Sequence, residues 1–224
     1  MKRFALSACV LLGMLAGRAF AGTEIPDKAI DWPPPVPCST YVFLEGRDVC
    51  ALLETLNEPP YPLTRVGQTK LAFRLIWSVG ERAPSIVIRT EIFDKNSAII
   101  KAYEVAPSGV LVEGLSRLKA DEISTIVDAA TTSDFWSQET RDLEPASVQG
   151  ATTENAKHDE VVIVCMSGLT IAGMNAQTDH VVSRECPHEK GNAKLLAFGQ
   201  AMLRIARQHF PDLATDKPWS DELD

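Results

Sequence analysis

The sequence predicts an α+β fold in which an antiparallel sheet carries two main helices on one face. Two observations lead to this prediction. Several segments alternate apolar and polar residues, as half-buried strands do, and each series of strands is followed by a segment with the apolar spacing of an amphipathic helix. Because this order of strands and then a helix occurs twice, we expect both helices to pack on the same sheet.

The part of the chain before the sheet predicts a small N-terminal arm stapled by a disulfide. Residues 22–37 (GTEIPDKAIDWPPPVP) are rich in proline and indicate an extended lead-in. Residues 38–57 indicate a short strand, a turn at Gly46 and then a helix, and prolines just beyond this segment end the helix. The apolar face of this helix is formed by Val49, Leu52, Leu53 and Leu56.

The first series of strands opens with the pattern KLAFRLIW, which places large apolar residues on one side and Arg74 on the polar side of a half-buried strand. The next two strands alternate in the same way, and the polar turn Asp94–Asn96 makes them antiparallel partners. The predicted strands of this series are residues 70–77, 85–93 and 98–105, with a further short strand at 110–113.

A helix is predicted within residues 118–136 (LKADEISTIVDAATTSDFW), whose acidic residues near the start suit the positive end of the helix dipole. Phe135 and Trp136 follow closely, and we expect them to clamp the end of this helix onto the sheet. The apolar residues that define the buried side of the helix are Ile123, Ile126, Val127 and Ala130.

The second series begins after a polar loop of about twenty residues, 141–160, which is long enough to hold a binding site. A tight turn at Ser167-Gly168 is predicted between its first two strands. The last helix starts after Asn192 as N-cap and carries a broad apolar stripe. The predicted elements are strands at residues 160–166, 169–174 and 179–186, and a helix at 192–210.

The first residues predict a secretory signal peptide. A basic start is followed by an apolar run from Phe4 to Gly17, and small residues at Ala19 and Ala21 suit a signal peptidase. This run is shorter than the ~20 residues of a membrane-spanning helix. We therefore expect cleavage between Ala21 and Gly22, a periplasmic or secreted protein, and no membrane span after cleavage. The predicted organisation is a signal peptide at 1–21, a lead-in at 22–37, a single α+β domain at 38–212 and an acidic flexible tail at 213–224.

The charge of the chain argues against nucleic acid as a partner. The whole sequence has a formal net charge of −8, and loss of the three basic residues of the leader lowers it to −11. Phosphate backbones repel such a surface. We expect a protein partner instead.

The cysteines predict disulfides, since four remain after the leader is removed from an exported chain. Three connectivities are possible, and Cys38–Cys50 with Cys165–Cys186 is favoured because each pair lies within one local unit. The alternative is a zinc site, but the spacing of its four candidate ligands matches no known zinc motif, so we predict no metal. Those candidates are Cys165, His180, Cys186 and His188.

Motifs that would place a catalytic centre are missing: the sequence has no nucleophile elbow, phosphate-binding loop or zinc-protease motif. Ser116 to Lys119 matches S-x-x-K, which we interpret as a chance match in the approach to a helix. We predict no catalytic residue and no cofactor. The alternative is a hydrolase or metal-dependent enzyme that uses His158, Asp159 and His180 as an acid–base group.

From Leu71 to about Ala206 the chain resembles small exported bacterial proteins of uncharacterised function. The resemblance lies in FRLIW, IVIR, the Phe135-Trp136 pair, Asp159 before a strand, and HVVSRECP before the last helix. It implies no catalytic residue, since the group has no assigned activity. The sequence thus favours a non-enzymatic domain of the protein-binding, envelope accessory or inhibitor type.

Overall fold

The computed structural model of the chain describes residues 25, 49–59, 68–79, 84–140, 167–185, 187 and 190–214. A short helix comes first, followed by four strands, a helix, two strands and a last helix. The helices are α1 (Val49–Thr55), α2 (Ala120–Thr132) and α3 (Ala193–His209), with single 3-10 turns η2 (Phe135–Ser137) and η3 (Lys190–Asn192). The strands are β1 (Leu71–Val79), β2 (Ser85–Asp94), β3 (Ser97–Ala106), β4 (Gly109–Leu118), β5 (Ser167–Asn175) and β6 (Asp179–Glu185).

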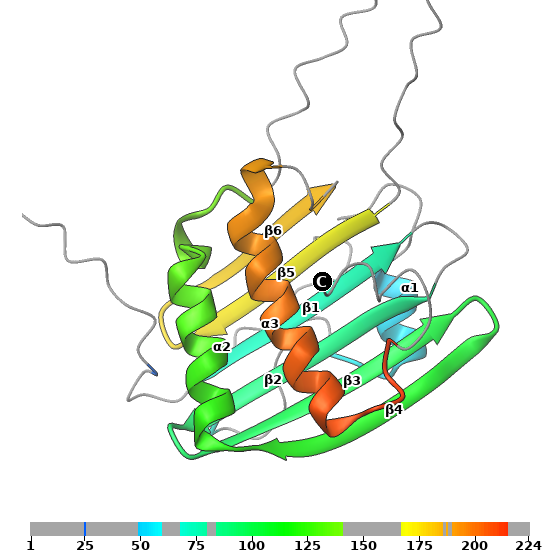
Figure 1. Ribbon diagram of the computed structural model, residues 1–224, viewed down its shortest axis with the longest axis horizontal. Helices are drawn as coiled ribbons and strands as arrows, with labels where there is room; N and C mark the ends of the chain where they lie inside the picture. Colours follow the sequence, from blue (N-terminus) through cyan, green and yellow to red (C-terminus); the bar gives the residue numbers. More distant parts are fainter. Residues whose placement is uncertain are drawn as a thin grey trace, which may run out of the picture.

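All six strands form one antiparallel sheet in the order β4-β3-β2-β1-β5-β6 (Figure 1). Strands β1 to β4 follow one another as hairpins. Helix α2 follows β4 and packs on one face of the sheet, and the next strand, β5, pairs with the side of β1 that β2 leaves free. The predicted α+β class with an antiparallel sheet is therefore confirmed. Its two edge strands are β4 and β6.

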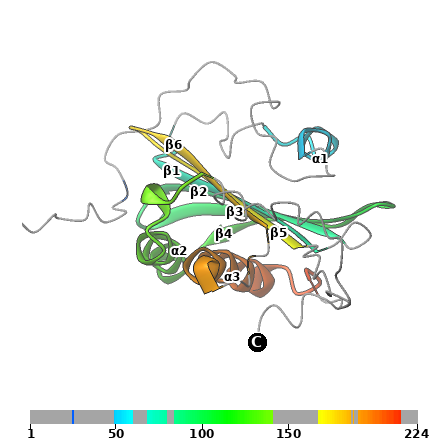
Figure 2. The ribbon, with the colours of Figure 1, turned by 90° about the horizontal axis from the view of Figure 1, so that it is seen from above.

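Helices α2 and α3 lie side by side on one face, which we call the helix-covered face (Figures 1 and 2). Alternation along β1 explains the packing, because every second side chain points to this face. The main core lies between sheet and helices and includes the fully buried Phe73 and Trp77 of β1 and Phe198 and Met202 of α3.

The other side of the sheet, which we call the opposite face, carries α1 (Figure 2). The predicted apolar side of this helix is confirmed, since Val49, Leu53 and Leu56 are buried there. They pack against Ile76, Val87, Tyr103 and Val105 from β1, β2 and β3. The sheet is thus covered on both sides, and its inner strands are buried on both faces.

An aromatic cluster fixes the chain after α2 to the sheet. The ring of Phe135 lies 5.8 Å from that of Phe73 and 5.7 Å from that of Phe198, both nearly edge to face. Trp136 packs beside it, 5.0 Å from the Phe135 ring. Such arrangements are favourable for aromatic rings. The prediction that Phe135 and Trp136 clamp the helix end onto the sheet is confirmed.

Three local predictions are wrong. Ser167 and Gly168 form no turn, because they belong to β5 and pair with Val79 and Ser78 of β1. The short strand predicted at 110–113 is longer: β4 continues to Leu118, so Ser116 lies in the strand that leads directly into α2. Arg74 has an exposed fraction of 2%, although alternation alone predicted a polar, accessible side.

The packed body continues two residues past the predicted domain boundary at 212. Leu213 and Ala214 are buried in the main core. The backbone N–H of Ala214 donates to the buried carboxylate of Glu104 at 2.8 Å, which fixes the chain after α3. At the other end, Ile25 from the predicted lead-in packs against the same core.

Several predicted features lie outside the described residues: the leader with Ala21 and Gly22, most of the lead-in, and most of the acidic tail. The same holds for Cys38, Cys165 and Cys186, and for Cys50 the structure describes the backbone in α1 but not the side chain. The disulfide pairing therefore stays a prediction. In the part of the chain that is described, no helix has the length and apolarity needed to cross a membrane.

Candidate functional site

Three basic side chains lie directly across from one another on the opposite face. The strand register pairs Arg74 of β1 with Arg89 of β2, and Arg89 with Lys101 of β3. Like charges that face each other across strands destabilise a sheet. A row of three cations in a partly buried position therefore requires a negative partner.

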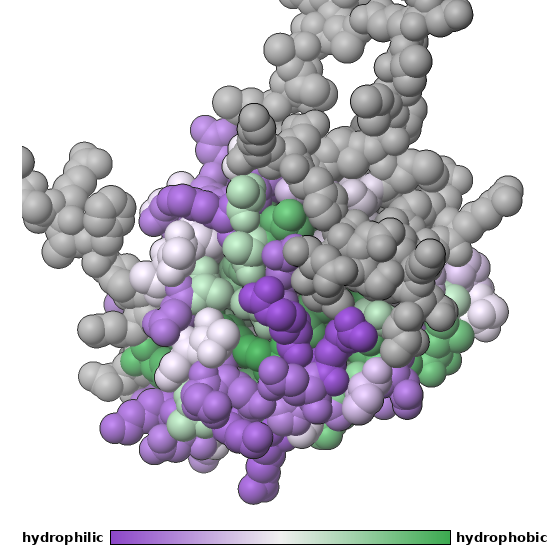
Figure 3. All heavy atoms as spheres, in the orientation of Figure 1, coloured by the Kyte–Doolittle hydropathy of each residue, from purple (hydrophilic) through white to green (hydrophobic). Residues whose placement is uncertain are grey.

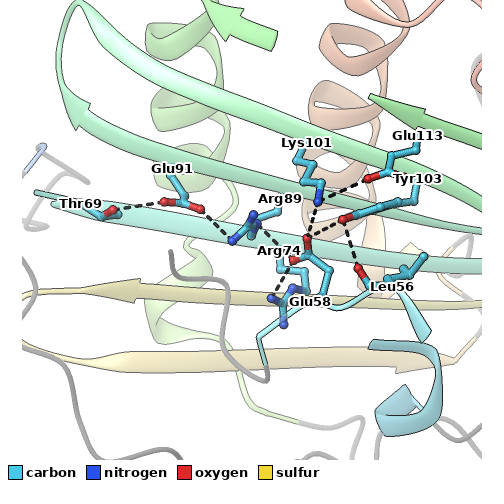
Figure 4. A network of polar contacts seen from close by, with 9 residues as sticks. All are labelled: Leu56, Glu58, Thr69, Arg74, Arg89, Glu91, Lys101, Tyr103 and Glu113. Atoms are coloured by element: carbon cyan, nitrogen blue, oxygen red, sulfur yellow. Dashed lines mark hydrogen bonds and ion pairs between the residues drawn. The ribbon is translucent and has the colours of Figure 1, made fainter. Parts of the chain in front are cut away.

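Glu58 supplies the negative charge, and its side chain is 1% exposed (Figure 4). One carboxylate oxygen, Oε2, accepts from Arg74 Nη2 at 3.2 Å and lies 3.1 Å from Arg89 Nε, with which it forms an ion pair. The other, Oε1, accepts from the Tyr103 hydroxyl at 2.8 Å and lies 3.6 Å from Lys101 Nζ. One carboxylate thus contacts all three cations.

The end of α1 directs Glu58 toward the sheet. Asn57 adopts a left-handed conformation with φ of 50°, which Asn tolerates better than most residues. Its N–H donates to the carbonyl of Glu54 at 3.0 Å, and the Glu58 N–H donates to that of Leu53 at 2.8 Å. These two bonds define a Schellman motif, which ends the helix and turns the chain.

A second carboxylate extends the network along β2. Glu91 forms an ion pair with Arg89, whose Nη1 lies 2.9 Å from Oε1, and its other oxygen accepts from the Thr69 hydroxyl at 3.2 Å. On the other side, Lys101 Nζ lies 3.6 Å from Glu113 and 4.7 Å from the centre of the Tyr103 ring. We call this set the Glu58 network. Its members are Glu58, Thr69, Arg74, Arg89, Glu91, Lys101, Tyr103 and Glu113.

Burial dominates the electrostatics of the network. It lowers the pKa of Arg74 to about 10, because removal from water disfavours the charged guanidinium, while the nearby Glu58 carboxylate acts in the opposite direction. Burial also raises the pKa of Tyr103 above its ordinary value, and its hydrogen bond to Glu58 adds to this effect. At neutral pH both groups stay protonated. The network therefore attaches α1 to the sheet through paired charges.

His180, the one residue of the alternative enzyme site that is described, lies on β6 at the helix-covered face. Its ring centre is 5.2 Å from that of Phe135 and 6.4 Å from that of Trp136. Burial is the largest cause that lowers the pKa of His180 below its ordinary value, so the ring is neutral at neutral pH. His158 and Asp159 lie outside the described residues. His180 is thus part of the aromatic cluster.

A hydroxyl, an imidazole and a carboxylate contact one another in series, an arrangement that the sequence analysis did not find. Ser116 Oγ of β4 lies 2.9 Å from His209 Nδ1 at the end of α3, and His209 Nε2 lies 3.1 Å from Glu122 Oε2 at the start of α2. The three come from distant parts of the chain, and no short motif connects them. This order of contacts also occurs in catalytic triads.

The surroundings of Ser116 differ from those of a catalytic serine. A hydrolase needs N–H donors directed at the oxyanion beside the nucleophile. The N–H of Lys119, where α2 begins, donates instead to Glu122 at 2.7 Å. Ser116 also lies within a paired strand rather than on an exposed turn. We interpret the chain of contacts as a link between the ends of α2 and α3 and strand β4.

The edge strand β4 carries exposed apolar residues. Among the described residues, the large apolar side chains that are exposed all lie in β4: Val110 at 44%, Leu111 at 52% and Leu115 at 64%. Figure 3 shows a mainly hydrophilic surface over much of the helical layer, with apolar surface at the right-hand margin, toward the turn between β3 and β4. Exposed apolar residues that gather on one element mark an interaction site more often than scattered ones do.

The two sheet edges differ in how the chain covers them. At β6, the N–H of Ser183 donates to the carbonyl of Thr140 at 2.8 Å, and Arg184 donates to the carbonyl of Glu139 at 2.9 Å. The segment after η2 therefore covers part of that edge. In the described part of the chain, the backbone hydrogen bonds of β4 between Val110 and Arg117 all go to β3.

Together, the fold and these clusters define an antiparallel α+β domain in which the edge strand β4, as far as the described residues go, pairs on one side only. No group of three His, Cys, Asp or Glu side chains among the described residues is arranged to hold a metal ion. Comparison of the chain with protein-family models, with curated proteins and with solved structures finds no match.

Proposed function

We propose that this chain is an exported, non-enzymatic protein-binding domain of the envelope accessory or inhibitor type, and that it binds an extended segment of a polypeptide along β4. The observation that carries the proposal is the position of Val110, Leu111 and Leu115, which are exposed together on an edge strand. The leader and the disulfides Cys38–Cys50 and Cys165–Cys186, both expected from the sequence, are part of the same proposal.

Backbone chemistry makes an edge strand a binding site. Half of its N–H and C=O groups point away from the sheet, and an added strand satisfies them. Proteins commonly protect such edges with charge, and β4 does carry Glu113 and Arg117. Leu115 lies between these two residues and is 64% exposed. An exposed apolar side chain at the middle of a charged edge indicates that β4 binds a specific partner strand. An edge whose charges served only to prevent association would not need it.

The proposal can be tested with a random peptide library displayed on phage and selected against the full chain. We expect extended peptides with apolar residues at alternate positions, because a strand added to β4 would place every second side chain on the same face of the sheet as Leu115. Leu115→Glu should abolish their binding. The control is Thr125→Glu, which adds the same charge at an exposed position of α2 and should leave binding unchanged.

Both variants must keep the circular dichroism spectrum and the thermal midpoint of the wild type for the comparison to hold. Peptides that bind the wild type and Leu115→Glu equally well would contradict the proposal. So would a selection that yields no binder to the wild type.

A further inference from the structure

We propose that the polypeptide bound by β4 is β4 of a second copy of this chain, so that two sheets join into one about a twofold axis. This inference rests on the proposed function, because it names the partner of the same edge. The two strands run antiparallel, and the axis passes next to Leu115 of each copy. Such an interface uses the same surface on both molecules, as in most homodimers.

The charges along β4 select this register. Glu113, Leu115 and Arg117 occupy alternate positions of the strand and so lie on the same face of the sheet. When Leu115 faces its own copy, Glu113 of each molecule faces Arg117 of the other. Two ion pairs then flank a central apolar contact, one on each side. Opposite charges at facing positions stabilise a strand pair.

Neighbouring registers lack this complementarity. An axis at Glu113 places the two Glu113 carboxylates opposite each other, and like charges at facing positions destabilise a sheet. An axis at Gly114 places Glu113 against Leu115 and Leu111 against Arg117, which buries charge against apolar groups. The sequence of the edge is therefore self-complementary in one of these three registers.

The two faces of the sheet differ next to the axis. On the helix-covered side, Gly114 faces Ser116 of the second copy, and the ring of Phe210 already fills the space over Gly114, where a Cβ atom would overlap with a ring carbon. On the opposite face, the side chain of Glu113 is 59% exposed and already lies 3.6 Å from Lys101. Arg117 of the second copy then becomes a second cation beside the same carboxylate. The dimer thus extends the Glu58 network across the axis.

The test is a charge exchange measured by sedimentation equilibrium of the full chain, from micromolar to near-millimolar concentrations. Glu113→Arg and Arg117→Glu each place two like-charged pairs in the interface, and each should raise the dimer dissociation constant about tenfold or more. The double variant Glu113→Arg/Arg117→Glu restores both pairs with exchanged signs. We expect it to dimerise within about threefold of the wild type.

The double variant also serves as the folding control, because it loses the contact between Lys101 and Glu113 just as the single variant Glu113→Arg does. A wild-type chain that stays monomeric over the whole concentration range overturns the inference. A double variant as weak as the single variants overturns it too. A monomeric chain whose peptide ligands still depend on Leu115 would refute the dimer and leave the proposed function standing.

Discussion

The two faces of the sheet are held by different forces. On the helix-covered face, aromatic and aliphatic side chains such as Phe73, Phe135 and Phe198 interlock without charge. On the opposite face, three cations in adjacent strands depend on Glu58, a carboxylate carried by the segment after α1. The stability of the helix-covered face should therefore depend on the shapes of its side chains. The stability of the opposite face should depend on the balance of its charges.

The two faces should therefore differ in how strongly a single substitution affects the stability of the protein. Apolar burial is distributed over many contacts, each of which contributes little. Removal of one buried charge leaves its partners uncompensated in a poorly solvated place. Glu58 contacts three cations at once, so one substitution there affects three strands.

The strongest test compares two substitutions that keep size nearly constant. Glu58→Gln removes the charge and replaces one acceptor oxygen by an N–H donor, and we expect the free energy of unfolding to fall by about 3–5 kcal/mol, because Arg74 and its neighbours lose their counter-ion. Met202→Leu, at a fully buried position of the other face, should cost less than about 1.5 kcal/mol. Urea denaturation of both variants measures the two effects.

Equal losses in the two variants would contradict the contrast between the faces. A loss below about 1 kcal/mol in Glu58→Gln would mean that the three cations are not left uncompensated when the carboxylate loses its charge.

The layers of this fold could be predicted from the sequence because they follow from periodicity. Alternation placed β1, β2 and β3, and the spacing of apolar residues placed α2 and α3. Periodicity does not determine where a strand ends when polar residues continue the alternation. The predicted short strand at 110–113 therefore missed the rest of β4, which extends to Leu118.

The candidate surfaces were harder to predict because they depend on strand register. Arg74, Arg89 and Lys101 are far apart in sequence, and only the pairing of β1, β2 and β3 places them in a row. The need for a counter-ion then follows from elementary electrostatics. The exposed edge depends in the same way on the strand order, since β4 is an edge only because β5 returns to β1.

A second test examines the shape sensitivity of the helix-covered face. A Cβ atom at Gly173 would lie 2.5 Å from a ring carbon of Phe135 and 3.1 Å from one of Phe73. Because other rings hold Phe135 in place, we expect Gly173→Ala to reduce the free energy of unfolding by about 1–3 kcal/mol. The control is Gly191→Ala, whose Cβ would meet nothing within 4 Å.

Chemical denaturation of the two variants gives the comparison. If Gly173→Ala is as stable as Gly191→Ala, the aromatic cluster can shift without cost, and the shape sensitivity inferred for this face is wrong.

The smallest expected effect concerns pH, and it comes from the one titratable group of the aromatic cluster. Burial lowers the pKa of His180 in the folded protein, so the unfolded chain takes up a proton first as the pH falls below about 6.5. Stability attributable to His180 is thus complete above that pH and decreases as the pH falls toward the lower folded pKa. His180→Phe keeps an aromatic ring beside Phe135 and removes this titration.

Thermal unfolding of wild type and variant between about pH 8 and about pH 5 isolates the effect, because the other titrating groups are common to both chains. We expect the wild type to lose more stability than His180→Phe over this range. Parallel pH profiles would mean that the His180 ring has the same proton affinity in the folded and unfolded chains. Burial among aromatic rings would then have no electrostatic cost, and the apolar surroundings of Phe135 would tolerate a protonated His180.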